Sequence, residues 1–554
     1  MAEDAAGQIW VGTENGLRCY DANFQRKEIG VSRFEVRALL VDRHGVVWIG
    51  TSGNGLMCYK NGRFTSFKKS GGLVNDFVTA LFEDREGSLW IGTRDGLSQI
   101  TDLKLPIYSS TEGLLGGSCH AVSASPKGGL WVATSGGMSY FDGKQARNYT
   151  PADGLPNPYI KRVFEAKNGD IYLIDGLTVG IYAEGKMVAR YTPSGMPVAM
   201  AEDTQGVVVS VVSNLFRVSR TQFVPYSFKD GQAPPFVWIH NLASGKDGSL
   251  WVASVNGIFR VKDGTFQQWS VPEGLSWYNV HWIFEDSDGT IWAGLLTGMA
   301  RLKNNQIRNI AQHNGLFDNF IFAIVPDDFG YFWVDSMRGI FRVSRQSLND
   351  FCDGKTDQVK CEAYDGLEAV KTVGKTDQEW VGCKTKDGRI WFPSSQGVVM
   401  IDPANLRVNP TPPLVYIRQV RVNGKELKDN KVSAFPHGKG DLEFQYKALS
   451  YIAPQKVQFR YQLEGYDRDW IESGNKKSVS YMNLKPGKYK FRVIACNADG
   501  VWNTDGDSFA IELLPHFYQT IWFYLGCAVL GMAGLWGGYA WRVGHLSRND
   551  SVGP

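Results

Sequence analysis

The stretch DREGSLWIGTRDGL, residues 84–97, decides the fold because variants of it recur through most of the chain. Ten marker residues occupy the position of Trp90, at intervals of 37 to 42 residues with one interval of 58. A glycine stands three residues before every marker, and an aspartate stands six residues before six of them. The markers are Trp10, Trp48, Trp90, Trp131, Tyr172, Val209, Trp251, Trp292, Trp333 and Trp391. A repeat of this length indicates an architecture built from one supersecondary unit.

Each repeat predicts a tight turn followed by a strand. In Asp84-x-x-Gly87 the aspartate can bond nearby backbone, and the glycine can take a positive φ. The run LWIGT that follows alternates as a half-buried strand does. A glycine with an aliphatic residue then starts the next strand, and a further Gly-Leu pair precedes the next repeat. Four short strands per repeat predict one blade of a β-propeller.

Ten markers exceed the four to eight blades of one propeller. We expect the last seven to form a closed seven-bladed propeller over residues 111–403. The first three are expected to form three blades of an incomplete N-terminal propeller over residues 1–110. The interval of 58 residues predicts an insertion between about Ser347 and Lys375 that includes Cys352 and Cys361. In an oxidising compartment this pair could form a disulfide, and two free thiols are the alternative.

The repeats end before the Pro-rich segment NPTPPL, residues 409–414. Alternating strands follow and predict an immunoglobulin-like β-sandwich over residues 412–514. Residues 520–541 form a run of 22 residues without a charge and with aromatic residues at both ends. As a helix this run is about 33 Å long, which suffices for a transmembrane helix. The predicted fold class is therefore all-β with one C-terminal transmembrane helix and a cytoplasmic stub, residues 542–554.

The charges around the apolar run predict its orientation. Arg542 and Arg548 follow the run, and no Lys or Arg lies between Val493 and Gln519. Positive residues favour the cytoplasmic side, so residues 1–519 are expected in the periplasm and the C-terminus in the cytoplasm. This predicts a single-pass protein of the inner membrane. A large exported region without an export signal, followed by a stub without a domain, suggests a fragment of a longer protein.

Composition and motifs exclude several classes of function. The 59 Lys and Arg residues balance 56 Asp and Glu residues, which argues against direct binding of nucleic acid. The eight histidines are dispersed and no Cys-x-x-Cys occurs, so we expect no metal site. Neither a phosphate-binding Walker loop nor a Gly-x-Ser-x-Gly elbow is present. The chain is therefore expected to have no catalytic residues, no cofactor and no enzyme activity of its own.

The loops between blades supply the candidate ligand-binding residues. Each loop follows an inter-blade Gly-Leu pair and leads into an innermost strand near the propeller mouth. There Trp277, Tyr278, Asn157 and Asn319 are the residues least typical of turns. Aromatic faces and amides suit a small molecule or an oligosaccharide. The alternative is that Trp277 and Tyr278 only pack between blades.

The segments RYQLEGYDRDW (460–470) and YMNLKPGKYKFRVIACNADGVWN (481–503) resemble the triple-tyrosine (Y_Y_Y) domain. The repeats, including DGRIWFPSSQGVVMIDP (387–403), resemble two-component regulator propellers. The resemblance covers residues 1–541. This family usually carries fourteen repeats as two seven-bladed propellers, and the ten repeats here suggest a sensor truncated at both ends.

The resemblance implies the ligand-sensing and membrane-spanning part of a bacterial two-component sensor histidine kinase, hybrid kinases included, acting as a homodimer. A sensor region of a membrane diguanylate cyclase is the alternative. A membrane-anchored carbohydrate-active enzyme and an adhesion module are less favoured.

Overall fold

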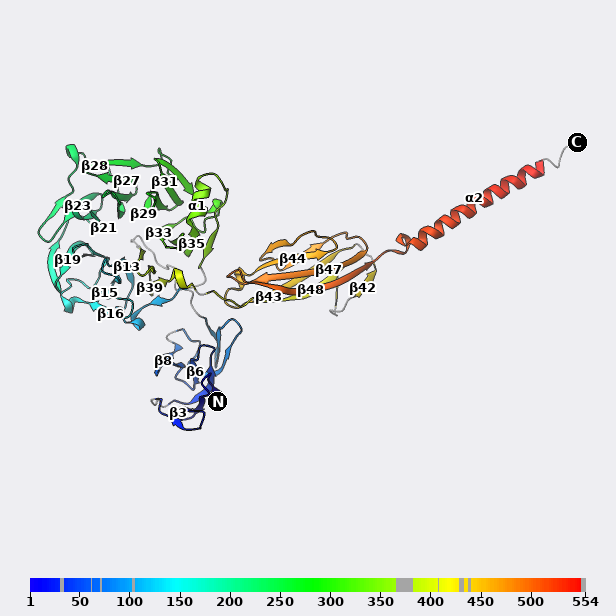
Figure 1. The fold of residues 1–554 in the computed structure, drawn as a ribbon, viewed down its shortest axis with the longest axis horizontal. Helices are drawn as coiled ribbons and strands as arrows, with labels where there is room; N and C mark the ends of the chain where they lie inside the picture. The colour runs from blue at the N-terminus through cyan, green and yellow to red at the C-terminus, as the bar shows by residue number, and fades with distance from the viewer. Residues whose placement is uncertain are drawn as a thin grey trace. The chain divides into compact units, whose positions relative to one another are not determined.

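The computed structural model describes residues 1–29, 34–60, 62–69, 72–101, 105–364, 382–406, 408–427, 433–436 and 440–549. The chain divides into two compact units (Figure 1). One unit is Leu103–Arg407 and the other combines Met1–Asp102 with Val408–Pro554. The repeats before and after residue 103 thus belong to different units.

The unit Leu103–Arg407 is a ring of seven four-stranded antiparallel sheets, counted over its described residues (Figure 1). Six of these blades follow one another along the chain, and within each blade the first strand is the innermost. Their strands are β13 (Cys119–Ala124), β14 (Leu130–Thr134), β15 (Gly137–Phe141) and β16 (Ala146–Tyr149); β17 (Arg162–Glu165), β18 (Ile171–Asp175), β19 (Thr178–Ala183) and β20 (Lys186–Tyr191); β21 (Pro197–Asp203), β22 (Gly206–Val211), β23 (Asn214–Val218) and β24 (Phe223–Pro225); β25 (Ile239–Ser244), β26 (Leu250–Ser254), β27 (Gly257–Lys262) and β28 (Thr265–Trp269); β29 (Val280–Glu285), β30 (Ile291–Leu295), β31 (Gly298–Lys303) and β32 (Gln306–Ile310); β33 (Ile321–Pro326), β34 (Tyr331–Ser336), β35 (Gly339–Ser344) and β36 (Cys361–Ala363). The fold class predicted for this region is confirmed.

The seventh blade joins the two ends of the ring. Strands β37 (Cys383–Lys384), β38 (Ile390–Ser394) and β39 (Gly397–Ile401) come from its end, and β12 (Ile107–Tyr108) from its beginning. Ile107 lies opposite Val399 in this antiparallel pair. The ring is therefore closed by backbone hydrogen bonds between distant parts of the chain. The sequence predicts the ring to begin at residue 111, whereas the closing strand β12 lies before that residue. The sequence did not predict this strand, because it has two residues and no marker.

The turn before each marker is built as its sequence predicts. Gly330, three residues before Trp333, has a φ of 87°, and the corresponding glycine has a positive φ in all ten repeats. Asp327 Oδ1 accepts hydrogen bonds from the backbone N of Phe329 and of Tyr331, at 2.9 and 2.8 Å. Its Oδ2 also accepts one from the indole Nε1 of Trp333, at 3.0 Å. This bond to the indole, which the sequence did not predict, fixes the buried marker to its own turn. It recurs for the pairs Asp4–Trp10, Asp42–Trp48 and Asp84–Trp90.

The segment Met1–Asp102 contains three further blades. Two of them have four strands and the third has three among its described residues. The strands are β1 (Ala2–Glu3), β2 (Ile9–Thr13), β3 (Gly16–Tyr20) and β4 (Arg26–Lys27); β5 (Val36–Val41), β6 (Val47–Thr51), β7 (Leu56–Lys60) and β8 (Arg63–Phe67); β9 (Val78–Glu83), β10 (Leu89–Thr93) and β11 (Gly96–Ile100). No strand pairing joins the first of these sheets to the last within the described residues, so they form a partial propeller.

The segment after Val408 forms a two-sheet β-sandwich, as predicted. The strands are β40 (Leu414–Val422), β41 (Lys425–Glu426), β42 (Ser433–Pro436), β43 (Leu442–Leu449), β44 (Gln458–Glu464), β45 (Ile471–Gly474), β46 (Ser478–Tyr481), β47 (Gly487–Cys496) and β48 (Trp502–Leu514). One sheet has the order β41-β40-β43-β46 and the other the order β42-β48-β47-β44-β45. Between them the rings of Phe444 and Phe491 stack with centroids 4.0 Å apart. Both side chains are fully buried, so the core lies between the two sheets.

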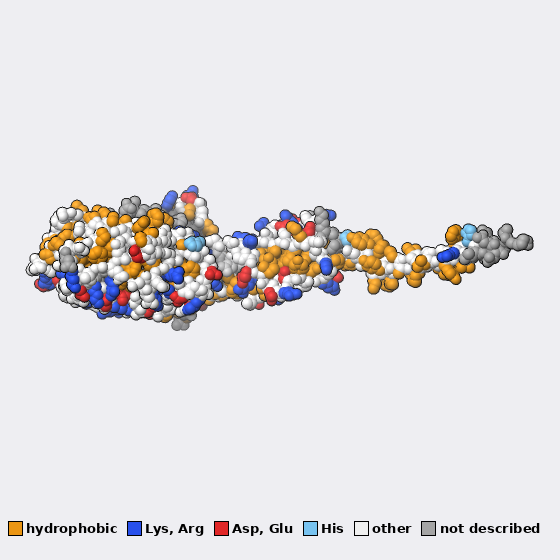
Figure 2. All heavy atoms as spheres, turned by 90° about the horizontal axis from the view of Figure 1, so that it is seen from above, with side chains coloured by type: hydrophobic (Ala, Val, Ile, Leu, Met, Phe, Trp, Pro, Cys, Tyr) orange, Lys and Arg blue, Asp and Glu red, His pale blue; other side chains and the backbone are white. Residues whose placement is uncertain are grey.

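Two α-helices occur in the described part of the chain, α1 (Arg345–Cys352) and α2 (Ile521–Asn549). A 3₁₀ turn, Phe517–Gln519, leads from the sandwich into α2. Within α2, Ile521–His545 is long and apolar enough to cross a membrane, and none of it is buried (Figure 2). The predicted stub is residues 542–554, and its first part, residues 542–549, continues this helix, because no Pro interrupts it.

The predicted insertion begins with α1. Cys352 and Cys361 are free thiols, and burial raises the pKa of each to about 11. The rest of the insertion, residues 365–375, lies outside the described residues.

Candidate functional site

One face of the ring exposes a set of large apolar side chains, which we call the mouth face. They lie in the loops that precede the innermost strands and in the turns between the second and third strands of a blade. Its members are Tyr159, Leu177, Val237, Trp277, Tyr278, Phe320 and Met337. The backbone N of Met337 donates to the O of Phe320, so a turn and a loop support each other. Figure 2 shows hydrophobic side chains along one side of the ring and charged side chains along the other.

The structure places all four predicted ligand-binding residues on the mouth face. Trp277 and Tyr278 are 50% and 51% exposed, so about half of each side chain is open to solvent. Asn157 Oδ1 accepts a hydrogen bond from the backbone N of Tyr159, at 2.9 Å. Asn319 Oδ1 accepts one from the backbone N of Gln312, at 2.8 Å. The two asparagines therefore hold loops in shape, while the two aromatic rings are free to meet a ligand.

Three histidines lie beneath the mouth face, each as the second residue of an innermost strand. They are His120 on β13, His240 on β25 and His281 on β29. Their Nε2 atoms are buried and have no hydrogen-bond partner among the described residues. The rings of His240 and His281 stack with centroids 4.5 Å apart. His120 packs on Tyr159 of the mouth face, with centroids 4.6 Å apart, which connects the exposed rim to this inner layer.

These imidazoles are neutral at pH 7. Burial lowers the pKa of all three, and it lowers that of His281 to about 4 with the help of the neighbouring His240. A buried charge loses its hydration, which favours the uncharged ring. Arg162 Nη2 donates to the backbone O of His240, at 3.4 Å. A neutral imidazole both donates and accepts hydrogen bonds, so this layer suits an uncharged polar ligand.

The sequence did not single out these histidines, although it contained the signal. Each lies eleven residues before its marker, Trp131, Trp251 or Trp292. Aligned on the repeat, they occupy one structural position in three blades. The spacings between the histidines are irregular, and only their positions within the repeat show the relation. No group of three His, Cys, Asp or Glu that could hold a metal ion is found among the described residues.

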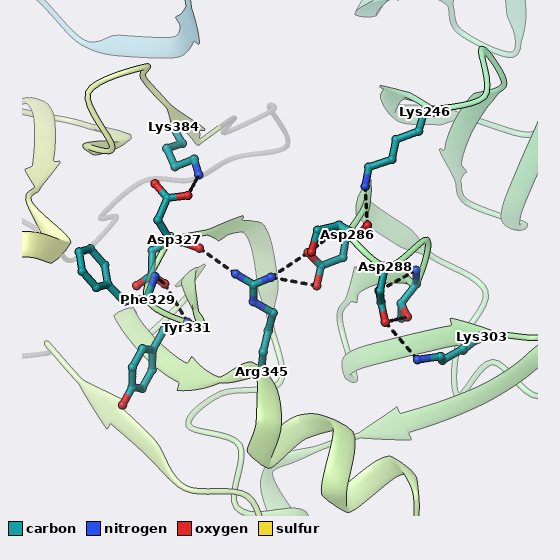
Figure 3. A network of polar contacts seen from close by, with 12 residues as sticks. Lys246, Asp286, Asp288, Lys303, Asp327, Phe329, Tyr331, Arg345 and Lys384 are labelled. Atoms are coloured by element: carbon teal, nitrogen blue, oxygen red, sulfur yellow. Dashed lines mark hydrogen bonds and ion pairs between the residues drawn. The ribbon is translucent and has the colours of Figure 1, made fainter.

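A second polar network lies around the start of α1 (Figure 3). Arg345 Nη1 donates to Asp286 Oδ1, at 3.0 Å, and Nη2 to the backbone O of Asp327, at 2.8 Å. In four other repeats the aspartate at this position accepts from the marker indole, whereas here Trp292 Nε1 is buried and has no partner among the described residues. The contacts fix α1 to the turns of two blades, and we assign this network a structural role.

Comparison with known proteins identifies both kinds of domain. The Y_Y_Y domain family matches residues 450–514, and the two component regulator propeller family matches residues 72–95 and 274–296. The chain thus carries regulator propeller repeats followed by a Y_Y_Y domain. No curated protein sequence matches it.

A solved structure shares this fold. It is the extracellular domain of the hybrid two component system BT3049 from B. thetaiotaomicron, with a TM-score of 0.69 and 19% identity. The match covers 93% of this chain and 72% of that one. The extracellular domain of BT4673 from the same organism gives a TM-score of 0.43 at 20% identity, over 93% of this chain and 74% of that one. The first similarity establishes the fold.

Proposed function

We propose that this chain is the ligand-sensing and membrane-spanning part of a bacterial two-component sensor histidine kinase. The observation that carries the proposal is the order of parts: regulator propeller, Y_Y_Y domain, and an apolar helix directly after the last strand of the sandwich. A ligand that binds one of two arrangements of the sensor more tightly would bias a cytoplasmic output. In this proposal the chain has no catalytic activity of its own and signals as a homodimer.

The mouth face is the proposed ligand site of this sensor. It combines exposed aromatic rings with neutral imidazoles beneath them, and both suit the faces and hydroxyl groups of an oligosaccharide. Trp277 and Tyr278 would contact the ligand first because they are the most exposed aromatic rings of this face. The imidazole of His120 lies one ring further in, against Tyr159.

In the proposed topology, residues 1–519 lie in the periplasm, α2 crosses the inner membrane once, and the C-terminus is cytoplasmic. Arg542 and Arg548 follow the apolar segment and favour this orientation. A green fluorescent protein fused after Pro554 should fluoresce, whereas alkaline phosphatase fused at the same position should be inactive. The opposite pair of results would overturn the orientation.

The sensing role is tested by a chimera. The chain is fused after Pro554 to the cytoplasmic part of a histidine kinase, and phosphorylation is measured in membranes with a panel of oligosaccharides. We expect at least one oligosaccharide to change the phosphorylation rate. A parallel fusion to a diguanylate cyclase domain asks whether the sensor drives either output.

Variants of the chimera assign the response to the mouth face. Trp277→Ala and Tyr278→Ala should each weaken the response about tenfold or more, because a lost aromatic contact costs about 1–3 kcal/mol. The control is Phe329→Ala, which removes an equally exposed ring from a turn at the start of β34 (Figure 3). An unchanged response in both mouth-face variants would contradict this site.

A further inference from the structure

A second candidate site lies along the outer strands of one blade, and one end of it reaches Gly274 in the loop that carries Trp277 and Tyr278. It is an open groove of about 870 Å³ between the hairpin β31–β32 and the end of α1, and we call it the rim groove. Three cations line it, Arg301, Lys303 and Arg308, against the single carboxylate of Asp353. Asp353 pairs with Arg301, and Asp288, outside the groove, pairs with Lys303, so the excess positive charge is that of Arg308. A groove with such an excess attracts anions.

Two of these cations face each other directly. Arg301 on β31 lies opposite Arg308 on β32 in the antiparallel pair. Side chains at such positions start about 4.5–5.5 Å apart, and like charges placed there destabilise the sheet. A negative charge near such an arginine pair would therefore reduce the repulsion between the two side chains.

The protein supplies that charge to only one of the two. Arg301 is buried, and its Nη1 donates to Asn349 Oδ1 at 2.8 Å and its Nη2 to Asp353 Oδ1 at 2.6 Å. Its Nε is also buried and has no partner among the described residues. Arg308 is exposed in the groove and makes no ion pair with any described residue. Arg308 thus presents a guanidinium whose charge is uncompensated.

The remaining polar groups suit a ligand larger than an ion. Lys303 Nζ donates to Asp288 Oδ2 at 3.0 Å (Figure 3). The amides of Asn304 and Gln306 line the groove, and both side chains are exposed. A smaller cavity of about 250 Å³ shares Lys303 and Asn304, so the groove continues around the hairpin. Amides bind hydroxyl groups, while a guanidinium fork binds a planar or tetrahedral oxyanion.

We propose that the rim groove binds a hydroxylated ligand that carries an oxyanion, a carboxylate or a sulfate group, held by Arg308. The oxyanion balances the arginine pair, and the amides of the hairpin bind neighbouring hydroxyl groups. The polar groups that would hold this ligand differ from those of the mouth face, and binding to them does not depend on the proposed signalling role.

Isothermal titration of the full chain in detergent tests this proposal. The probes are digalacturonic acid, its dimethyl ester, which keeps the hydroxyl groups without the charge, and galactose 6-sulfate. We expect digalacturonic acid, galactose 6-sulfate or both to bind. If digalacturonic acid binds, its dimethyl ester should bind at least tenfold more weakly. Higher salt should weaken binding, because the charges in an open groove are screened.

Two variants assign the binding to Arg308. Arg308→Gln should reduce the affinity for the acid about ten- to a hundredfold, the usual effect of losing a hydrogen bond to a charged group. The control is Arg147→Gln. Arg147 is exposed and occupies the same position in the blade β13–β16, where it lies opposite Tyr140 instead of a second arginine. The control should bind normally.

A stability measurement guards against misfolding. The thermal midpoint of Arg308→Gln should equal or exceed that of the wild type, because the substitution removes the repulsion between the paired arginines. The proposal is overturned if neither acid binds, if acid and ester bind equally, or if Arg308→Gln binds as the wild type does. If no oligosaccharide changes phosphorylation in the chimera while the full chain still binds an acid through Arg308, the sensing role is refuted and the proposal for the rim groove is supported.

Discussion

His281 should make the stability of the ring depend on pH below neutrality. Its ring is buried against His240, and its pKa lies near 4 instead of the ordinary 6.5. In the unfolded chain the imidazole takes up a proton as the pH falls through 6.5, whereas in the folded ring it stays neutral until about pH 4. The unfolded state therefore binds more protons in this window, and stability falls as the pH is lowered.

The size of the effect follows from the pKa. The full difference between 6.5 and about 4 corresponds to about 3 kcal/mol, and at pH 5 the loss amounts to about 2 kcal/mol. His240, whose pKa is also lowered by burial, adds a loss of the same sign.

Calorimetry at pH 7.5 and pH 5.0 measures this slope for the wild type and for His281→Phe, which keeps an aromatic ring and cannot titrate. The variant should lose less stability between the two pH values, by about 2 kcal/mol. His44→Phe, which changes a histidine in an exposed turn of the partial propeller, is the control. The same pH dependence in wild type and His281→Phe would show that the imidazole is not held neutral, and would refute the reasoning.

Three further predictions concern other parts of the chain. Asp327→Ala should destabilise the ring by about 2–4 kcal/mol in denaturant unfolding, because the indole of Trp333 and two backbone N–H groups lose their acceptor. The control is Asp328→Ala, which changes the exposed neighbour and should cost less than about 1 kcal/mol. Phe491→Ala should destabilise the sandwich by about 3–5 kcal/mol, and a loss below 1 kcal/mol would contradict its place in the core. A flexible Gly/Ser insertion after Leu514 in a signalling chimera should abolish the response and leave ligand affinity unchanged, because only five residues separate the sandwich from residue 520. Normal switching would place the coupling elsewhere.

The repeat made much of the fold predictable from sequence. The glycine before each marker and the spacing of the markers gave the blades, because a turn that needs a positive φ leaves a visible mark in the sequence. The closing strand β12 left no such mark. Its two residues, Ile107 and Tyr108, are in a sheet only because distant residues of β39 pair with them.

The candidate sites were less predictable than the fold. Trp277 and Tyr278 could be placed near the mouth from their loop, but only the structure could show that half of each ring is exposed. The arginine pair of the rim groove depends on the register of two strands, and a shift by one residue would separate it. The exposure of a side chain and the pairing of two side chains depend on residues that are close in space. The repeat motif does not specify those residues.

The seventh blade has a consequence for how such a chain can be assembled in evolution. Because β12 and β39 are hydrogen-bonded neighbours, the polypeptide enters and leaves the ring about 5 Å apart. The ring therefore behaves as a cassette inserted between Asp102 and Val408, the two borders of the other unit. Such a cassette can be gained, lost or exchanged for a ring of a different blade number without stretching the chain on either side, so one membrane-proximal part can acquire new recognition surfaces by recombination alone.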